Sequence, residues 1–304
     1  MTTTPEPAPT AAPARPDVGL RPLLPSVVTV FDRFGNTRDS GGRPITRALC
    51  RTVGANENRA IEPRYTGSPA TIASLTDLIA ELDSLGCDFR IRQVFRSNQE
   101  QDVVYRKFQA WRAAGCPAPN TARWNGATMS TAAASAPNRS HHGWGGAMDI
   151  GLGNLRFGDG VSGDAALARF WDIAAKYGFT PIISEPRIVR SEAWHFDHLG
   201  PMKAVRDLFF AHRDENEAYA SAAGCAAEVA CVLMGTHSGA SQIERSVQAR
   251  LLAHGVWVGL PDGKIGPKTR AGLTSLGITA DRDVGVILQQ MHDKGIGYAT
   301  LAAL

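Results

Sequence analysis

The sequence predicts an α+β fold in which helices flank a small antiparallel sheet. Apolar residues recur at helical spacing over residues 71–85, and Gly86 follows as a stop signal. Residues 89–95 then alternate apolar and polar side chains, which is typical of a half-buried strand. The later helices, strands and loops follow one another without a β-α-β rhythm. This order favours a small antiparallel sheet over a doubly wound parallel one.

The remaining elements follow from the same patterns. We expect helices at 98–114, 165–177 and 203–233, strands at 180–183 and 193–199, a loop rich in small residues at 116–139, and irregular structure at 27–69. A chain of 304 residues is about two domains long. We expect a disordered Pro/Ala-rich leader at 1–20, a main domain at 21–235 with its core at 71–200, a linker at 236–241 and a separate unit at 242–304.

Composition and charge exclude several classes of protein. Hydrophobic residues make up 43% and charged residues 20%, which suits a globular protein with a real core. The net charge is only +3 and the basic residues are scattered, so nucleic acid is not a favoured partner. No apolar run approaches the roughly 18 residues of a membrane span. The first residues lack both the basic region and the apolar region of a signal peptide, so we expect a protein made in the cytoplasm without one. We also expect a monomer.

The five cysteines are odd in number and contain no C-x-x-C pair. This pattern fits neither a disulfide framework nor a cysteine zinc cage. We therefore expect reduced, partly buried thiols, with a bridge between Cys225 and Cys231 as the alternative.

A candidate metal centre combines residues from two segments. His142 and Asp149 are seven positions apart across a glycine-rich stretch, and His195 follows on a predicted strand. Two imidazoles and a carboxylate can hold a catalytic zinc and leave the fourth position to water. Glu192, three residues before His195, could accept the proton of that water. Each residue alone is ordinary in a loop, and the combination indicates the site.

Two motifs give the chain a resemblance to a known family. They are Ser140-x-His142-x-x-Gly145-x-Ala147-x-Asp149 and Glu192-x-Trp194-His195, with Phe95-Arg96-Ser97 and Gln101 upstream. This pattern resembles the zinc D-alanyl-D-alanine carboxypeptidase and dipeptidase family of the VanY and VanX type, which also includes phage L-alanyl-D-glutamate endopeptidases. The resemblance covers roughly residues 71–200 and implies a hedgehog/DD-peptidase-like fold.

The resemblance implies a role for each matching residue. His142, Asp149 and His195 would bind one zinc ion, and Glu192 would be the general acid and base. Arg96 would face the substrate and stabilise an oxyanion or a carboxylate, which suits a forked guanidinium.

Other residues near the motifs leave alternatives open. Ser140 would hydrogen-bond near the metal or substrate, or else cap a loop. Trp194 would touch substrate or simply pack against the pocket wall. We prefer His142 to its neighbour His141 because only His142 has the family's seven-residue step to Asp149. By strand alternation, His198 shares the face of Phe196, opposite to His195, and is not expected to be a ligand.

The C-terminal segment resembles a second family. Its motif runs Val247-Gln248-x-x-Leu251, Gly255 and Asp262-Gly263-x-Ile265-Gly266-Pro267-x-Thr269-Arg270. This motif resembles the peptidoglycan-binding domain found beside cell-wall hydrolases, usually a three-helix bundle. Ser275-Leu276-Gly277 replaces the usual Phe-Gln ending, so a purely structural bundle is the alternative.

Together these observations predict a zinc peptidase that cleaves an amide bond in the stem peptides of bacterial peptidoglycan. The bond is either the terminal D-Ala-D-Ala amide or the L-Ala-D-Glu amide, and the C-terminal module would hold the enzyme on the wall. The setting expected is a phage-type endolysin released through a separate pore. The alternatives are a non-catalytic wall-binding or structural protein on the same fold and a dipeptidase acting on free D-Ala-D-Ala.

Overall fold

The structure is a computed structural model that describes residues 28–29, 66–117, 121–124, 127–130, 132–215 and 221–304. The predicted leader, residues 1–20, and most of the predicted irregular segment 27–69 lie outside these ranges. Among the described residues, no helix is both long and apolar enough to cross a bilayer.

A four-stranded antiparallel sheet organises the first half of the chain, which confirms the predicted α+β class. Its strands have the order β3-β6-β8-β7. They are β3 (Asp88–Gln93), β6 (Ala147–Arg156), β7 (Phe179–Pro181) and β8 (His195–His198). Two small pairs accompany the sheet, namely β1 (Val28–Thr29) with β2 (Thr66–Gly67), and β4 (Thr121–Trp124) with β5 (Ala127–Ser130).

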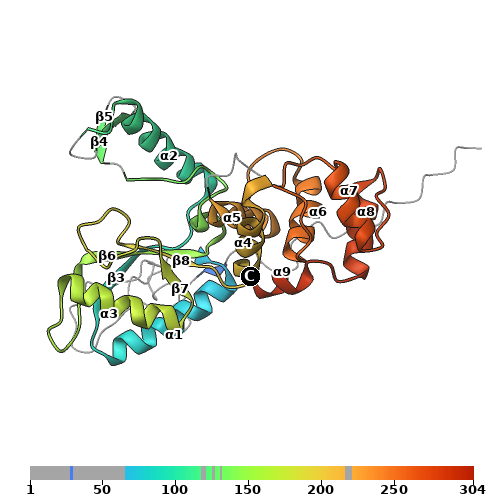
Figure 1. The fold of residues 1–304 in the computed structure, drawn as a ribbon. Helices are drawn as coiled ribbons and strands as arrows, with labels where there is room; N and C mark the ends of the chain where they lie inside the picture. Colours follow the sequence, from blue (N-terminus) through green and yellow to red (C-terminus); the bar gives the residue numbers. More distant parts are fainter. Residues whose placement is uncertain (1–27, 30–65, 118–120, 125–126, 131, 216–220) are drawn as a thin grey trace, which may run out of the picture.

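Helices α1 (Pro69–Ser84) and α3 (Gly163–Lys176) pack against this sheet (Figure 1). The Ser68 hydroxyl accepts a hydrogen bond from the Thr71 amide and Pro69 occupies the first turn, so α1 begins two residues before the predicted start at residue 71. Buried leucines of α1 meet Phe89, Phe170 and Phe196 in one core. This core holds the back of the sheet and leaves its other face available.

Helix α2 (Asn98–Ala113) and the strands β4 and β5 extend away from the sheet (Figure 1). A capping box starts α2, because Ser97 accepts from the Glu100 amide while the Glu100 carboxylate accepts from the Ser97 amide. Only Asn98 and Gln101 of this helix are buried, and both lie in its first turn. The helix is therefore anchored at one end.

The helical pattern over 203–233 corresponds to two separate helices in the structure. They are α4 (Met202–Ala211), followed by a short 3₁₀ turn η2 (Arg213–Glu215), and α5 (Ala222–Leu233). The Ser221 hydroxyl accepts from the Gly224 amide and so starts α5 as a new helix. Nearly every side chain of α5 is buried, so helical periodicity in the sequence could not separate it from α4.

The C-terminal segment forms α6 (Gln242–Ala253), α7 (Pro267–Ser275) and α8 (Val284–Asp293), with a short fourth helix α9 (Tyr298–Ala303). Helices α4 to α8 share one hydrophobic cluster, which also contains Trp144. The predicted linker, residues 236–241, therefore joins two helices of a common core. The last carbonyl, that of Leu304, accepts a hydrogen bond from the Ala70 amide of α1 at 3.1 Å, which ties the two halves together.

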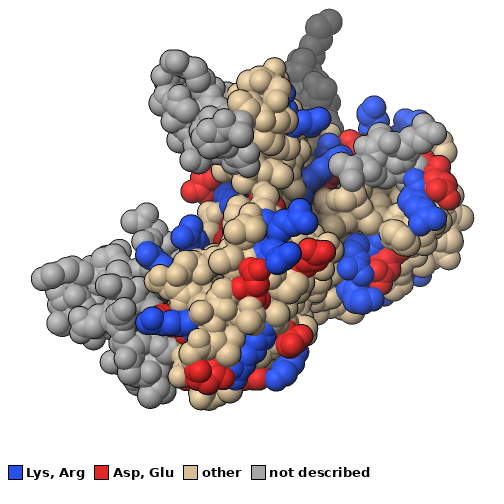
Figure 2. All heavy atoms as spheres, turned by 60° about the vertical axis from the view of Figure 1, so that its left-hand side comes forward, with Lys and Arg blue, Asp and Glu red and all other residues tan. Residues whose placement is uncertain are grey.

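Charge and cysteines behave as the composition indicates. Figure 2 shows acidic and basic side chains intermixed over the face drawn, in keeping with the small net charge.

Cys225 and Cys231 are both buried free thiols, so the alternative bridge between them is wrong. Burial raises the pKa of Cys231 to about 12, which keeps this thiol protonated.

Candidate active site

Strand pairing brings the three candidate metal ligands together. His142 lies in a short 3₁₀ turn, η1 (His141–Trp144), which leads directly into β6. Asp149 lies on β6 and pairs in register with His195 on β8. Gly145 links η1 to β6 with a φ of 77°, and a Cβ there would lie 2.6 Å from backbone atoms of residues 67 and 68. Only glycine fits this turn, which explains its place in the motif.

The donor atoms of these three residues converge. His142 Nε2 lies 3.2 Å from Asp149 Oδ1 and 3.2 Å from His195 Nδ1, and His195 Nδ1 lies 2.9 Å from Asp149 Oδ1. Ligand atoms about 2 Å from a tetrahedral zinc are roughly 3.3 Å apart, so the spacing suits one such ion. Among the described residues, these three form the group of His, Cys, Asp and Glu side chains whose donor atoms lie close enough together to hold a metal ion.

In each histidine, the hydrogen bond of the ring nitrogen that points away from the site determines whether the converging nitrogen has a free lone pair. His142 Nδ1 donates to the Val94 carbonyl at 2.6 Å, so His142 Nε2 carries a lone pair when the ring is neutral. His195 Nε2 lies 2.9 Å from Asp197 Oδ1 and donates to it, which leaves a lone pair on Nδ1. Two lone pairs and the Asp149 carboxylate then face one point. Such an arrangement repels itself unless a cation or a proton lies there, so the residues fit a divalent metal.

The electrostatics of the metal-free site agree with this reading. Burial alone would lower the pKa of His195, yet hydrogen bonds to Asp149 and Asp197 raise it to about 10. Burial would raise the pKa of Asp149, but the neighbouring His142 and His195 hold it well below its usual range. Without a metal, a proton on His195 supplies the positive charge that the three converging groups require.

Arg96 is fixed beside this cluster by several hydrogen bonds. Its Nε donates to Gln93 Oε1 at 2.8 Å, its Nη1 donates to Gln101 Oε1 at 2.8 Å, and its Nη2 lies 3.4 Å from Asp149 Oδ2. Its backbone amide also donates to the His142 carbonyl at 3.0 Å. The guanidinium is therefore held in one orientation at the edge of the candidate metal site.

Glu192 adopts an unusual backbone conformation next to the strand that carries His195. Its φ of 65° lies in the left-handed region, which costs free energy for a residue other than glycine. The carbonyl of Glu192 accepts a hydrogen bond from the His195 amide at 3.0 Å, which closes the turn into β8. Burial raises the pKa of Glu192 to about 7, with a further increase from Asp149 and opposing effects from His195 and Arg96. A carboxyl group with such a pKa can both accept and release a proton near neutral pH.

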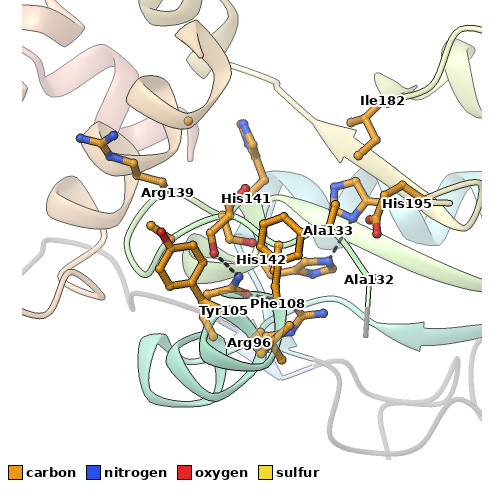
Figure 3. A pocket seen from close by; sticks show the side chains of 18 of the residues that line it. Arg96, Tyr105, Phe108, Ala132, Ala133, Arg139, His141, His142, Ile182 and His195 are labelled. Atoms are coloured by element: carbon orange, nitrogen blue, oxygen red, sulfur yellow. Dashed lines mark hydrogen bonds between the residues drawn. The ribbon is translucent and has the colours of Figure 1, made fainter. Parts of the chain in front are cut away.

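All the predicted site residues line one cleft of about 670 Å³. These residues are Arg96, Ser140, His142, Asp149, Glu192, Trp194 and His195. The cleft continues along α2 past Tyr105 and Phe108 and reaches the first turn of α5. Figure 3 shows Arg96, His142 and His195 around it, with the two aromatic rings of α2 nearby. Ser140 is buried, lines the cleft and makes no side-chain capping hydrogen bond to η1.

Two further histidines lie close by in different surroundings. His141 Nδ1 accepts from the Trp144 indole at 3.2 Å, and its Nε2 donates to the Ala223 carbonyl at 3.1 Å, so the ring attaches η1 to α5. His198 lies on the other face of β8, as strand alternation predicts, and its ring nitrogens contact hydroxyls of Thr71 and Ser74 at 3.0 Å. Neither ring belongs to the converging group.

Asp197 is a further residue of the site, and the sequence motifs did not indicate it. This buried carboxylate accepts the hydrogen bond from His195 Nε2, and its Oδ2 lies 3.9 Å from His141 Nε2. The signal was present, because residues 195 and 197 share a face of a strand by the same alternation that separates His195 from His198. A histidine and an aspartate at this spacing could have been recognised as a pair.

Comparisons with known proteins found one family model and similar solved structures. Residues 67–201 match the family model VanY, described as D-alanyl-D-alanine carboxypeptidase. A solved structure of the LdcB LD-carboxypeptidase has 18% sequence identity and a TM-score of 0.32, and the likeness covers 60% of this chain and 76% of that one. A vancomycin-resistance D,D-pentapeptidase VanY variant in complex with Zn(II) has 18% identity and a TM-score of 0.31, covering 55% of this chain and 89% of that one. A search of the curated proteins found no match.

Proposed function

We propose that the protein is a zinc-dependent peptidase that hydrolyses an amide bond in the stem peptides of peptidoglycan, because residues 67–201 match the VanY family model. The observation that carries this proposal is the convergence of His142, Asp149 and His195 in the same cleft as Glu192. The fit of their donor atoms to one cation supports a metallopeptidase, and the family match supports a cell-wall peptide as substrate.

In this proposal, His142, Asp149 and His195 would hold one Zn²⁺ through their converging donor atoms. Zinc in such a site lowers the pKa of a coordinated water and polarises a carbonyl group. Glu192 accepts the proton of the attacking water and then delivers it to the leaving amine. Burial raises the pKa of Glu192, which helps the carboxylate to hold that proton between the two steps.

Arg96 would stabilise negative charge on the substrate, either on the carbonyl oxygen as the amide is attacked or on a terminal carboxylate. Its orientation is set before substrate arrives, because Gln93 and Gln101 accept its hydrogen bonds. A preorganised donor of this kind needs little reorganisation during the reaction. Ser140 and Trp194 line the same cleft and would contact the peptide.

The size of the cleft favours a stem peptide over a free dipeptide. A volume of about 670 Å³ lies in the range of sites that enclose drug-sized ligands. The cleft also continues beyond the candidate metal centre, towards α2 and α5. Both the D-Ala-D-Ala carboxypeptidase and the L-Ala-D-Glu endopeptidase reaction would use the same metal site and the same base.

Residues 242–304 would bind the wall polymer and raise the local concentration of substrate. Helix α6 packs in the same hydrophobic cluster as α5, whose first turn lines the cleft. A wall-binding surface on these helices would therefore be presented at a constant position relative to the cleft. The endolysin setting stays a prediction.

The test is mass spectrometry of purified peptidoglycan fragments after incubation with the full chain, with Glu192→Gln, and with a chelated sample. We expect new peptide termini only with metal and with Glu192, and their masses identify the bond. Peptidoglycans of several chemotypes should be used, because the cleft walls set the side-chain preference. Stoichiometric zinc without cleavage of any of them would instead support the non-catalytic wall-binding alternative.

A further inference from the structure

Asp197 lies behind one of the candidate metal ligands. Its side chain is buried on β8, directly opposite Ala147 of β6 in the strand register, where a small neighbour leaves room for it. Its Oδ1 lies 2.9 Å from His195 Nε2. The other ring nitrogen, His195 Nδ1, is the atom that approaches Asp149 and His142. The two nitrogens of one ring therefore have separate partners.

We propose that Asp197 is a positioning residue that fixes the ring of His195 so that Nδ1 is presented to the metal. This inference rests on the proposed function, because it concerns the zinc site of that peptidase. Asp197 acts through His195 and does not itself ligate the ion, since its Oδ1 is engaged on the side of the ring away from the converging donor atoms.

The physical reason is the chemistry of a charge-assisted hydrogen bond. A carboxylate that accepts from Nε2–H keeps the proton on that nitrogen and leaves the Nδ1 lone pair available. The negative charge also makes Nδ1 a stronger donor to a cation. Because Asp197 is buried, its hydrogen bond with His195 is stronger than it would be in water.

The two candidate histidine ligands are oriented by different groups. His142 Nδ1 donates to a neutral backbone carbonyl, that of Val94, at 2.6 Å. His195 donates to a charged side chain that mutation can remove. Asp197 is held in turn by its place on β8, and its second oxygen lies 3.9 Å from His141 Nε2. The His195 side of the site is therefore the one whose support can be tested by substitution.

The experiment measures the zinc affinity of the full chain by competition with a chromogenic chelator. The variants are Asp197→Ala, Asp197→Asn and the matched control Asp88→Asn. Asp88 is another buried carboxylate of the sheet, on β3, and it forms an ion pair with Arg156 of β6 at 3.1 Å. We expect Asp197→Ala to weaken zinc binding about 10–100-fold. We expect a smaller loss for Asp197→Asn, because an amide oxygen can still accept from Nε2–H, and no change for Asp88→Asn.

A second readout does not depend on affinity or activity. In the zinc-loaded wild type, the His195 Nε2–H proton should give a downfield imidazole signal in the NMR spectrum that exchanges slowly with water. Asp197→Asn should move this signal upfield and Asp197→Ala should remove it. Because the Asn variant has nearly the same shape, it carries the test if the Ala variant fails to fold.

Unchanged zinc affinity and an unchanged imidazole signal in a folded Asp197→Ala protein would overturn the proposal. An equal loss of affinity in Asp88→Asn would also overturn it, since the effect would then be a general one of the sheet. A wild type that binds zinc but cleaves no peptidoglycan contradicts the proposed peptidase. In that case the affinity differences among the variants still support or reject the role of Asp197.

Discussion

The two faces of β8 each carry a histidine, and the two residues have opposite electrostatic properties. On the cleft face, His195 lies between Asp149 and Asp197, and these carboxylates raise its pKa to about 10 against the effect of burial. On the core face, the ring nitrogens of His198 contact the neutral hydroxyls of Thr71 and Ser74, the ring packs against Phe179, and burial lowers its pKa to about 4. The residue type is the same, so the surroundings alone decide whether a ring attracts a cation or stays neutral.

The largest difference between the faces should appear in metal binding. We expect His195→Gln to abolish stoichiometric zinc binding and peptidase activity, because one of three converging donors is lost. His198→Gln should leave the zinc content at that of the wild type, since its ring lies on the other side of the strand. Metal analysis of the two purified variants checks this. Zinc retained in His195→Gln, or lost in a folded His198→Gln, would break the comparison.

The next largest effect should come from Glu192, which precedes β8 on the cleft side. Glu192→Gln removes the proton acceptor and should lower kcat by about 10²–10⁴-fold. Zinc affinity should change little, because Glu192 is outside the group of converging donors. Kinetics on purified stem peptides, with zinc content measured in parallel, test this. Activity close to that of the wild type would rule out Glu192 as the base.

On the core face, the lowered pKa of His198 should make the free energy of unfolding depend on pH. The folded pKa of His198 is about 4 and its ordinary value is 6.5, so the folded state favours the neutral ring. This contribution is complete above pH 6.5 and is lost as the pH falls towards 4, by on the order of 3 kcal/mol. Urea unfolding of chelated protein at pH 7 and pH 4.5 should show a smaller decrease for His198→Gln than for the wild type.

His195 provides the opposite sign in the same chelated protein. Its raised pKa means that its stabilising contribution is present below pH 6.5 and is lost as the pH rises towards 10. His195→Gln should therefore reduce the loss of stability between pH 7 and pH 10. Equal pH dependence of unfolding in the two histidine variants would contradict the contrast between the faces.

The smallest effect should be the acidic limb of the pH profile of activity. The base must be ionised, so kcat/KM should fall about tenfold per pH unit below the pKa of Glu192. That pKa is raised to about 7 by burial in the metal-free site, and a bound cation stabilises the carboxylate and moves the limb to lower pH. Activity that rises as the pH falls from 7 to 5 would exclude Glu192 as the base.

Local rules in the sequence determined much of the sheet half. Sequence patterns located α1, α2 and α3 and the strands β3 and β8. All of them except α2 contribute buried apolar side chains to a single core. The positions of Gly145 and of the caps Ser68 and Ser97 follow from backbone geometry, which acts over a few residues. The motif residues also came together in one cleft, since their spacing reflects the strand pairing.

Only the tertiary structure decided the rest. Every residue of α5 from Cys225 to Leu233 is buried, so its boundary with α4 and the core that it shares with α6 depend on long-range packing. The left-handed conformation of Glu192 depends on the turn that surrounds it. The partner of His195 was within reach of strand alternation, but its burial and its 2.9 Å contact required the folded chain. Sequence patterns report local geometry, whereas burial and electrostatic environment arise from residues far apart in the chain.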